Sequence, residues 1–138
     1  MFRKSYSKKS IDDAASLVVR IDRIIETELE NFPVEGIPFS HEFLPIKLFQ
    51  GNEKRQKAKI RNLFNNGVLY AVLEKKFDGK NKDFFKYAKK VFSRTFNYGF
   101  GLRLGKKMYK GLLRDSKDTY EPNFRKGYKW GQNLYERI

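Results

Sequence analysis

Apolar side chains recur every three or four residues along most of this chain, and that periodicity restricts the fold more than any other feature. It is the spacing of one face of an α-helix, which has about 3.6 residues per turn. The clearest run lies between Ser10 and Asn31, and its apolar members are Leu17, Val18, Ile21, Ile24, Ile25 and Leu29. Charged residues fill the rest of this segment, so we predict an amphipathic helix with its N-cap at Ser10.

A second helix, bent along its length, is predicted from residue 52 to about residue 76. Its core face comprises Ile60, Leu63, Phe64, Val68, Ala71 and Val72. The tract Asn65-Asn66-Gly67 interrupts it, and such a tract is also typical of a helix C-terminus. The alternative is therefore a helix that ends there, followed by a short β-hairpin around residues 68–82 that turns at Asp78-Gly79.

Three further helices are predicted in the second half of the chain. The first begins after Asn81, and its core face comprises Phe84, Phe85, Ala88, Val91, Phe92 and Phe96. Glycines in residues 97–101 break that helix, and another spans about residues 101–114. The last begins near residues 119–121, with Pro122 in its first turn, where proline is tolerated.

The expected fold is mainly α, a compact bundle of about four to five helices. Residues 10–138 are predicted to form a single helical domain, because 138 residues is near the size of one domain. Residues 1–9 are predicted to be a flexible basic arm. Prolines and a glycine in residues 32–40 predict a loop, and residues 41–49 fit either a short helix or an extended segment.

Composition argues against several classes of site. The chain has no cysteine and one histidine, His41, so we expect no disulfide, no metal site and no cofactor. The longest apolar run, residues 68–73, is far shorter than the roughly 20 residues of a membrane span. No secretory signal is expected, because Asp12 and Asp13 follow the basic start. We therefore expect a cytoplasmic protein, or one inside a host cell.

Positive charge is distributed unevenly along the chain, whose formal net charge is +14. Residues 1–46 carry six basic and eight acidic side chains, whereas residues 47–138 carry twenty-four basic and eight acidic ones. This asymmetry favours a polyanionic partner for the second part, above all a nucleic acid. The alternative is a lysine-rich solvated surface of the kind that an AT-rich genome produces.

The strongest functional pattern lies in the predicted helix at 101–114. On a helical wheel its basic residues fall within about 60° of one direction. These residues are Arg103, Lys106, Lys107, Lys110 and Arg114. Gly101 and Gly105 lie in the middle of the apolar arc and would let another helix approach closely. Because like charges on one helix face repel each other, we interpret this face as a cationic docking surface.

Three more basic clusters are predicted to contact phosphates. They are Lys82, Lys86, Lys89 and Lys90 in the third helix, Lys54, Arg55 and Lys59 in the second, and Arg125, Lys126 and Lys129 in the last. Whether the clusters share one face depends on how the helices pack, and the sequence leaves this open.

Several aromatic residues lie beside cations or glycines: Tyr98, Phe100, Tyr109, Tyr128 and Trp130. Exposed aromatic rings among cations can stack unpaired bases. Trp130 and Tyr128 are the candidates for this role, with burial in the core as the alternative.

No catalytic motif is complete. Residues 99–107 approach the phosphate-binding loop, but Phe100 occupies the place of its first glycine and Lys107 that of its Ser or Thr. The carboxylates of Glu74, Asp78 and Asp83 have no spacing that requires a metal. We therefore predict that the protein is not an enzyme.

The leading prediction is a non-enzymatic nucleic-acid-binding protein that grips phosphates through Lys/Arg stripes in residues 54–129. One alternative is a small viral or mobile-element protein that binds an acidic surface of a host nucleic-acid machine and modulates it. Another is a subunit of a larger ribonucleoprotein. Binding of basic amphipathic helices to an anionic membrane surface is the least favoured interpretation. The choice between DNA and RNA, single and double strands, and oligomeric states stays open.

Overall fold

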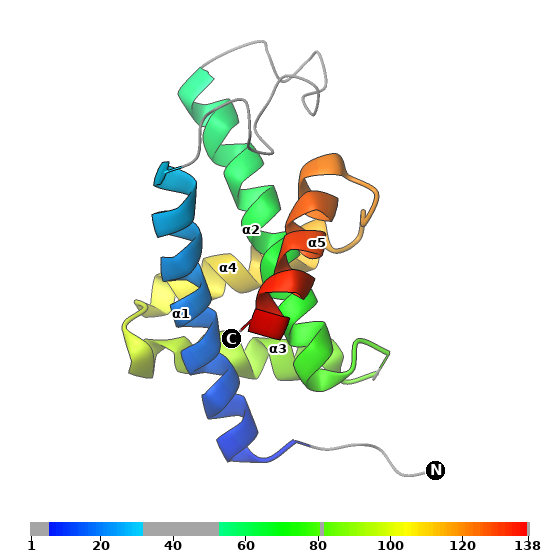
Figure 1. Cartoon of the computed structure of the whole chain (residues 1–138). Helices are drawn as coiled ribbons and strands as arrows, with labels where there is room; N and C mark the ends of the chain where they lie inside the picture. Colours follow the sequence, from blue (N-terminus) through cyan, green and yellow to red (C-terminus); the bar gives the residue numbers. More distant parts are fainter. Residues whose placement is uncertain (1–5, 32–52, 81, 138) are drawn as a thin grey trace.

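The computed structural model describes residues 6–31, 53–80 and 82–137, and it describes the side chains of residues 6–27, 58–80 and 82–137. Within these ranges the chain forms five α-helices, one short 3-10 helix and no strand (Figure 1). The elements are α1 Lys8–Asn31, α2 Glu53–Phe77, α3 Phe84–Arg94, η4 Thr95–Tyr98, α4 Leu102–Asp115 and α5 Pro122–Arg137. The predicted mainly-α bundle is thus confirmed.

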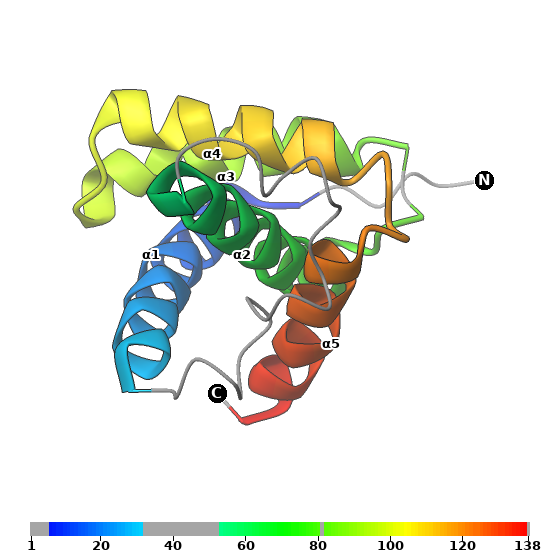
Figure 2. The same cartoon turned by 90° about the horizontal axis from the view of Figure 1, so that it is seen from above.

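Helix α2 lies at the centre of the bundle, between α1 and α5, and its most extensive contact is with α5. Helices α3 and α4 run beside each other and cross α1 and α2 on one side of the bundle (Figure 2). The largest fully buried side chains are Phe77, Phe84, Phe92, Phe124, Ile21, Ile25, Ile60, Leu69, Leu73 and Leu112. These residues come from all five α-helices, so the core holds the two groups of helices together.

The tract Asn65-Asn66-Gly67 lies inside an unbroken α2. The predicted helix over 52–76 is therefore confirmed. Residues 68–77 are helical, which removes the alternative of a β-hairpin around 68–82. Helix α2 ends before a turn in which Asp78 has a positive φ of 56° and accepts a hydrogen bond from the Lys80 N–H at 3.1 Å.

Packing explains why a glycine stands inside α2. A Cβ atom at Gly67 would lie 2.1 Å from the carbonyl oxygen of Phe124 in α5. Gly127 of α5 makes the reciprocal approach, because its Cβ would lie 2.0 Å from the carbonyl oxygen of Phe64. The two helix backbones therefore touch at this crossing, and only glycine leaves room for the contact.

Helix α1 begins earlier than predicted. Its N-cap is Ser7 instead of Ser10, since Ser7 Oγ accepts a hydrogen bond from the Ser10 N–H at 3.2 Å. Tyr6 already packs into the fold, with its ring 4.7 Å from that of Phe77 and 5.0 Å from that of Tyr87. Of the predicted basic arm at 1–9, residues 6–9 thus belong to the helical fold, and residues 1–5 lie outside the described residues.

The predicted break between the third and fourth helices is confirmed. It consists of η4 and Gly99, whose φ of 114° ends the 3-10 helix. Two residues of the predicted core face are exposed instead, Phe85 by 36% and Phe96 by 56%. Phe96 belongs to η4, whose tighter winding of about three residues per turn moves it off the α-helical spacing. Phe100 is buried, so it does not offer its ring to a ligand.

Helix α5 begins as predicted, with Pro122 as its first residue. Glu121 caps it, because its Oε2 accepts a hydrogen bond from the Phe124 N–H at 2.7 Å. Helix α3, by contrast, begins at Phe84, and the predicted cap Asn81 lies outside the described residues.

The predicted loop at 32–40, the segment 41–49 and His41 also lie outside the described residues. Within the described helices, no segment is both long enough and apolar enough to cross a membrane.

Candidate nucleic-acid interface

The five basic residues of α4, here called the α4 stripe, are all exposed: Arg103, Lys106, Lys107, Lys110 and Arg114. The opposite side of the helix buries Gly105 and Leu112. A Cβ at Gly105 would lie 2.5 Å from the carbonyl oxygen of Phe92, so the predicted close helix approach is confirmed there. It is wrong for Gly101, which precedes α4 and would carry a Cβ with no described atom within 4 Å.

A groove of about 880 Å³ lies along α4 and is called the α4 groove below. Helix α4 contributes Leu102, Arg103, Leu104, Lys106, Lys107, Met108, Lys110, Gly111 and Arg114 to its lining. The other lining residues are Arg61, Asn62, Asn65 and Asn66 of α2 and Asp22 and Glu26 of α1. The groove is thus lined by the whole α4 stripe, by a sixth cation, Arg61 of α2, and by two carboxylates of α1, Asp22 and Glu26.

The contributions of α1 and α2 to this groove were not predicted from the sequence. Arg61 is the last residue of the basic tract 54–61, which is a hint of its role. Asp22 and Glu26 lie four residues apart on one helix face, as in any acidic helix surface. Their position opposite α4 depends on how α1 packs, which no local pattern encodes.

Of the two carboxylates that line the groove, that of Asp22 is partly buried, whereas that of Glu26 is exposed. Partial burial raises the pKa of Asp22, and the neighbouring Glu26 raises it further. The cations Arg61 and Arg23 act in the opposite direction but do not outweigh these effects. The ionised form of Asp22 is therefore poorly solvated, and a hydrogen-bond donor in the groove would stabilise it.

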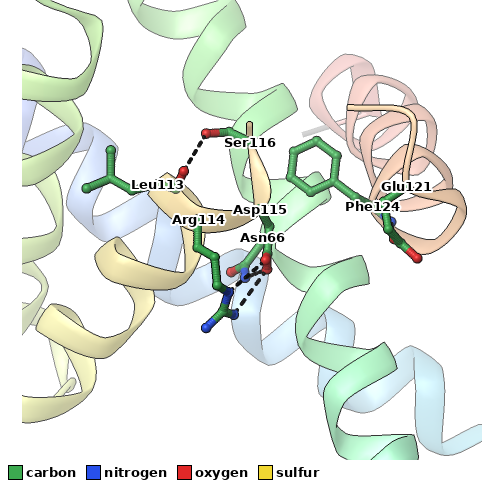
Figure 3. Close-up of polar contacts among 7 residues, drawn as sticks. All are labelled: Asn66, Leu113, Arg114, Asp115, Ser116, Glu121 and Phe124. Atoms are coloured by element: carbon green, nitrogen blue, oxygen red, sulfur yellow. Dashed lines mark hydrogen bonds and ion pairs between the residues drawn. The ribbon is translucent and has the colours of Figure 1, made fainter. Parts of the chain in front are cut away.

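The C-terminal end of the α4 stripe is anchored by the buried carboxylate of Asp115 (Figure 3). Asn66 Nδ2 donates a hydrogen bond of 2.7 Å to Asp115 Oδ2. Arg114 donates from Nε to Oδ1 at 2.9 Å and from Nη2 to Oδ2 at 3.3 Å. This hydrogen bonding raises the pKa of Arg114. Because Asp115 already balances its charge, Arg114 is a weaker phosphate ligand than an unpaired arginine would be.

The contact between Asn66 and Asp115 predicts a loss of stability in the Asp115→Ala variant. The substitution leaves the buried amide of Asn66 without its acceptor, which costs roughly 1–3 kcal/mol. We expect the free energy of unfolding, measured by urea titration with circular dichroism, to fall by about that amount. Glu136→Gln, at an exposed position of α5, is the control. Equal stability of the two variants would contradict the assignment.

The second predicted cluster lies around α3. Lys86, Lys89 and Lys90 are exposed on this helix, whereas Lys82 precedes it. Lys89 and Lys90 line a smaller groove of about 480 Å³. The remaining lining of that groove is Tyr6, Lys8, Ile11, Ser93 and Arg94, and Arg94 pairs with Asp12 of α1 at 2.9 Å. The structure thus places these lysines next to the start of α1, outside the α4 groove.

The described residues of the other two predicted clusters also lie outside the α4 groove. Arg125, Lys126 and Lys129 are exposed on α5, which lies on the far side of α2 from α1 (Figure 1). Lys59 is exposed on α2 and does not line the groove. The side chains of Lys54 and Arg55 lie outside those that the structure describes.

The two candidate stacking residues lie in the contact between α2 and α5. Tyr128 donates a hydrogen bond from its hydroxyl to Glu74 Oε1. Burial, together with this bond and the charge of Glu74, raises the pKa of Tyr128 to about 12. Trp130 is half-buried, with its ring 5.7 Å from that of Phe64. Both residues therefore contribute to helix packing, and neither lines the α4 groove.

Among the described residues, no group of three His, Asp or Glu side chains is placed to hold a metal ion. Glu74 is engaged with Tyr128, and Asp78 with the backbone of its own turn. The acidic residues considered from the sequence thus have individual partners.

No protein-family model, curated protein or solved structure matches this chain. The geometry of the α4 groove is therefore the basis on which a function can be proposed.

Proposed function

We propose that this protein binds nucleic acid without catalysis, and that the α4 groove is the main contact. The observation that carries the proposal is the alignment of the α4 stripe with Arg61 along one groove. Lys and Arg side chains in such an arrangement neutralise phosphates and release condensed counterions. The net charge of +14 would add long-range attraction to any polyanion.

A merely solvated surface accounts less well for this arrangement. The stripe residues on adjacent turns of α4 repel each other, and this repulsion lowers helix stability. Arg114, at the C-terminal end of the stripe, forms an ion pair with Asp115 at 2.9 Å. The four cations that precede Arg114 face the groove without an acidic residue of α4 among them. A bound phosphate backbone would relieve their repulsion.

The proposal predicts binding that depends steeply on salt. For about five phosphate contacts, the slope of log K against log salt is roughly −3.5 to −4.5, depending on the strandedness of the nucleic acid. Fluorescence anisotropy with labelled DNA and RNA between about 50 and 200 mM salt measures it. A lack of binding to every nucleic acid at the low-salt end would contradict the proposed function.

A second function is favoured by one further observation. Leu102 and Leu104 line the same groove and are exposed by 62% and 42%. Cations around exposed leucines also suit an acidic, amphipathic protein segment, as in a factor that docks on a nucleic-acid machine. Pull-down of a protein target together with absent binding to free nucleic acid would support this function over the first.

A further inference from the structure

The α4 groove has two chemically different walls. The α4 side carries hydrogen-bond donors with positive charge, namely Arg103, Lys106, Lys107 and Lys110. The side formed by α1 and α2 carries two acceptors, the carboxylates of Asp22 and Glu26, together with the side-chain amide of Asn65 and one cation, Arg61. An occupant that fits both walls must present anionic groups along one edge and hydrogen-bond donors along the other.

Asn65 is the acceptor with the least satisfied environment. Its Oδ1 is buried and has no hydrogen-bond partner within the described part of the chain. The neighbouring Asn66 differs, because its amide is occupied by Asp115. A buried polar atom without a partner costs free energy. A donor from a ligand would recover this cost if the Asn65 side chain turned its oxygen toward the groove.

The two carboxylates restrict the occupant further. A phosphate placed beside Asp22 or Glu26 would be repelled, so these residues work against a ligand that is anionic throughout. Asp22 is already short of solvation, as the rise in its pKa indicates. An uncharged group with N–H donors would interact favourably with both side chains.

A single nucleic-acid strand has this chemistry. Its phosphates run along one edge, and unpaired bases project from the other with their Watson–Crick edges free. Cytosine, adenine and guanine carry an exocyclic amino group, whereas thymine and uracil present oxygen in its place. Asp and Glu accept a hydrogen bond from the cytosine amino group in known patterns of base recognition. In a duplex these amino groups are engaged in base pairing, so the two carboxylates favour an unpaired strand.

We propose that the α4 groove binds single-stranded nucleic acid in one orientation, with phosphates on the α4 stripe and amino-bearing bases, cytosine foremost, on Asp22, Glu26 and Asn65. This inference rests on the proposed function and makes it more specific. It assigns Asp22 and Glu26 to base recognition and thereby explains acidic residues inside a groove that otherwise attracts anions.

The test compares labelled oligo(dC), oligo(dA) and oligo(dT) of about 12 nucleotides, within the usual range of single-strand sites. Duplexes of equal length are measured in parallel at neutral pH. For the native protein we expect oligo(dC) to bind about tenfold more tightly than oligo(dT), the value of one good hydrogen-bonded base contact. We expect the duplexes to bind more weakly than oligo(dC).

The variant Asp22→Asn/Glu26→Gln separates base recognition from simple repulsion. We expect it to lose most of the preference for oligo(dC) over oligo(dT), through weaker oligo(dC) binding. The control Asp13→Asn/Glu136→Gln removes two exposed carboxylates that do not line the groove, so it should keep the preference. Circular dichroism spectra confirm that both variants are folded.

Two outcomes would overturn the inference while the proposed function stands. One is tighter binding of all oligonucleotides by Asp22→Asn/Glu26→Gln, which would mean that the carboxylates only repel phosphates. The other is equal affinity for single strands and duplexes. Failure of every nucleic acid to bind, with or without capture of an acidic peptide, would overturn both the inference and the proposed function.

Discussion

Charge reversal in the α4 stripe is expected to weaken nucleic-acid binding by at least about 100-fold. The variant carries Arg103→Glu, Lys107→Glu and Lys110→Glu, three residues that line the α4 groove. A hydrogen bond to a charged group contributes roughly 1.5–3 kcal/mol, and about 1.4 kcal/mol corresponds to a tenfold change in affinity. Loss of even two such contacts therefore gives the expected reduction, and the new carboxylates add repulsion. Anisotropy titration at about 0.15 M salt measures it.

The matched control places the same three reversals on α5, as Arg125→Glu, Lys129→Glu and Arg137→Glu. Its net charge is identical to that of the α4 variant, but these exposed residues lie away from the groove. Long-range attraction is screened over about 8 Å at this ionic strength, so we expect the control to lose less than about tenfold in affinity. Equal losses in the two variants would mean that total charge, and not the α4 groove, determines binding. Such a result would mean that the basic residues of α5 also contact the nucleic acid.

The exposed stripe of α4 could be predicted from the sequence because it depends on one helix alone. Residues at spacings of three and four share a face in any α-helix, whatever surrounds it. The same holds for the start of α5 at Pro122 and for the glycine-rich break between α3 and α4, because both depend on local backbone chemistry. The groove itself could not be predicted, since Asp22 and Arg61 meet α4 only through the crossing of three helices.

The alternatives that the sequence left open and its errors have a common cause, which is that one residue type serves two structural purposes. Gly67 after two asparagines is typical of a helix end, but here it lets the backbone of α5 approach an unbroken helix. Gly101 follows the same small-residue spacing as Gly105, yet only Gly105 packs against a neighbouring helix. Phe96 continues the apolar spacing of α3 in the sequence, although the chain has already entered η4. Distinguishing these cases requires the positions of neighbouring elements.

The crossing of α2 and α5 leads to a large expected effect on stability. In Gly127→Ala, the new Cβ would lie 2.0 Å from the carbonyl oxygen of Phe64 and 2.8 Å from its carbonyl carbon. Both are backbone atoms, so no side-chain rotation can relieve the clash, and the two helices must move apart. Overpacking of this kind costs roughly 1–3 kcal/mol and sometimes more. Alanine returns about 1 kcal/mol through its higher helix propensity.

We therefore expect Gly127→Ala to lower the free energy of unfolding by up to about 2 kcal/mol, measured by urea titration, with a matching fall in melting temperature. Gly67→Ala should behave alike, since its Cβ meets the carbonyl oxygen of Phe124 at 2.1 Å. Gly101→Ala is the control: its Cβ would meet no described atom within 4 Å, so its stability should change by less than about 1 kcal/mol. Helix propensity alone predicts the opposite result, namely that Gly127→Ala is more stable than the native protein. A stabilised Gly127→Ala variant would therefore mean that α2 and α5 do not approach each other this closely.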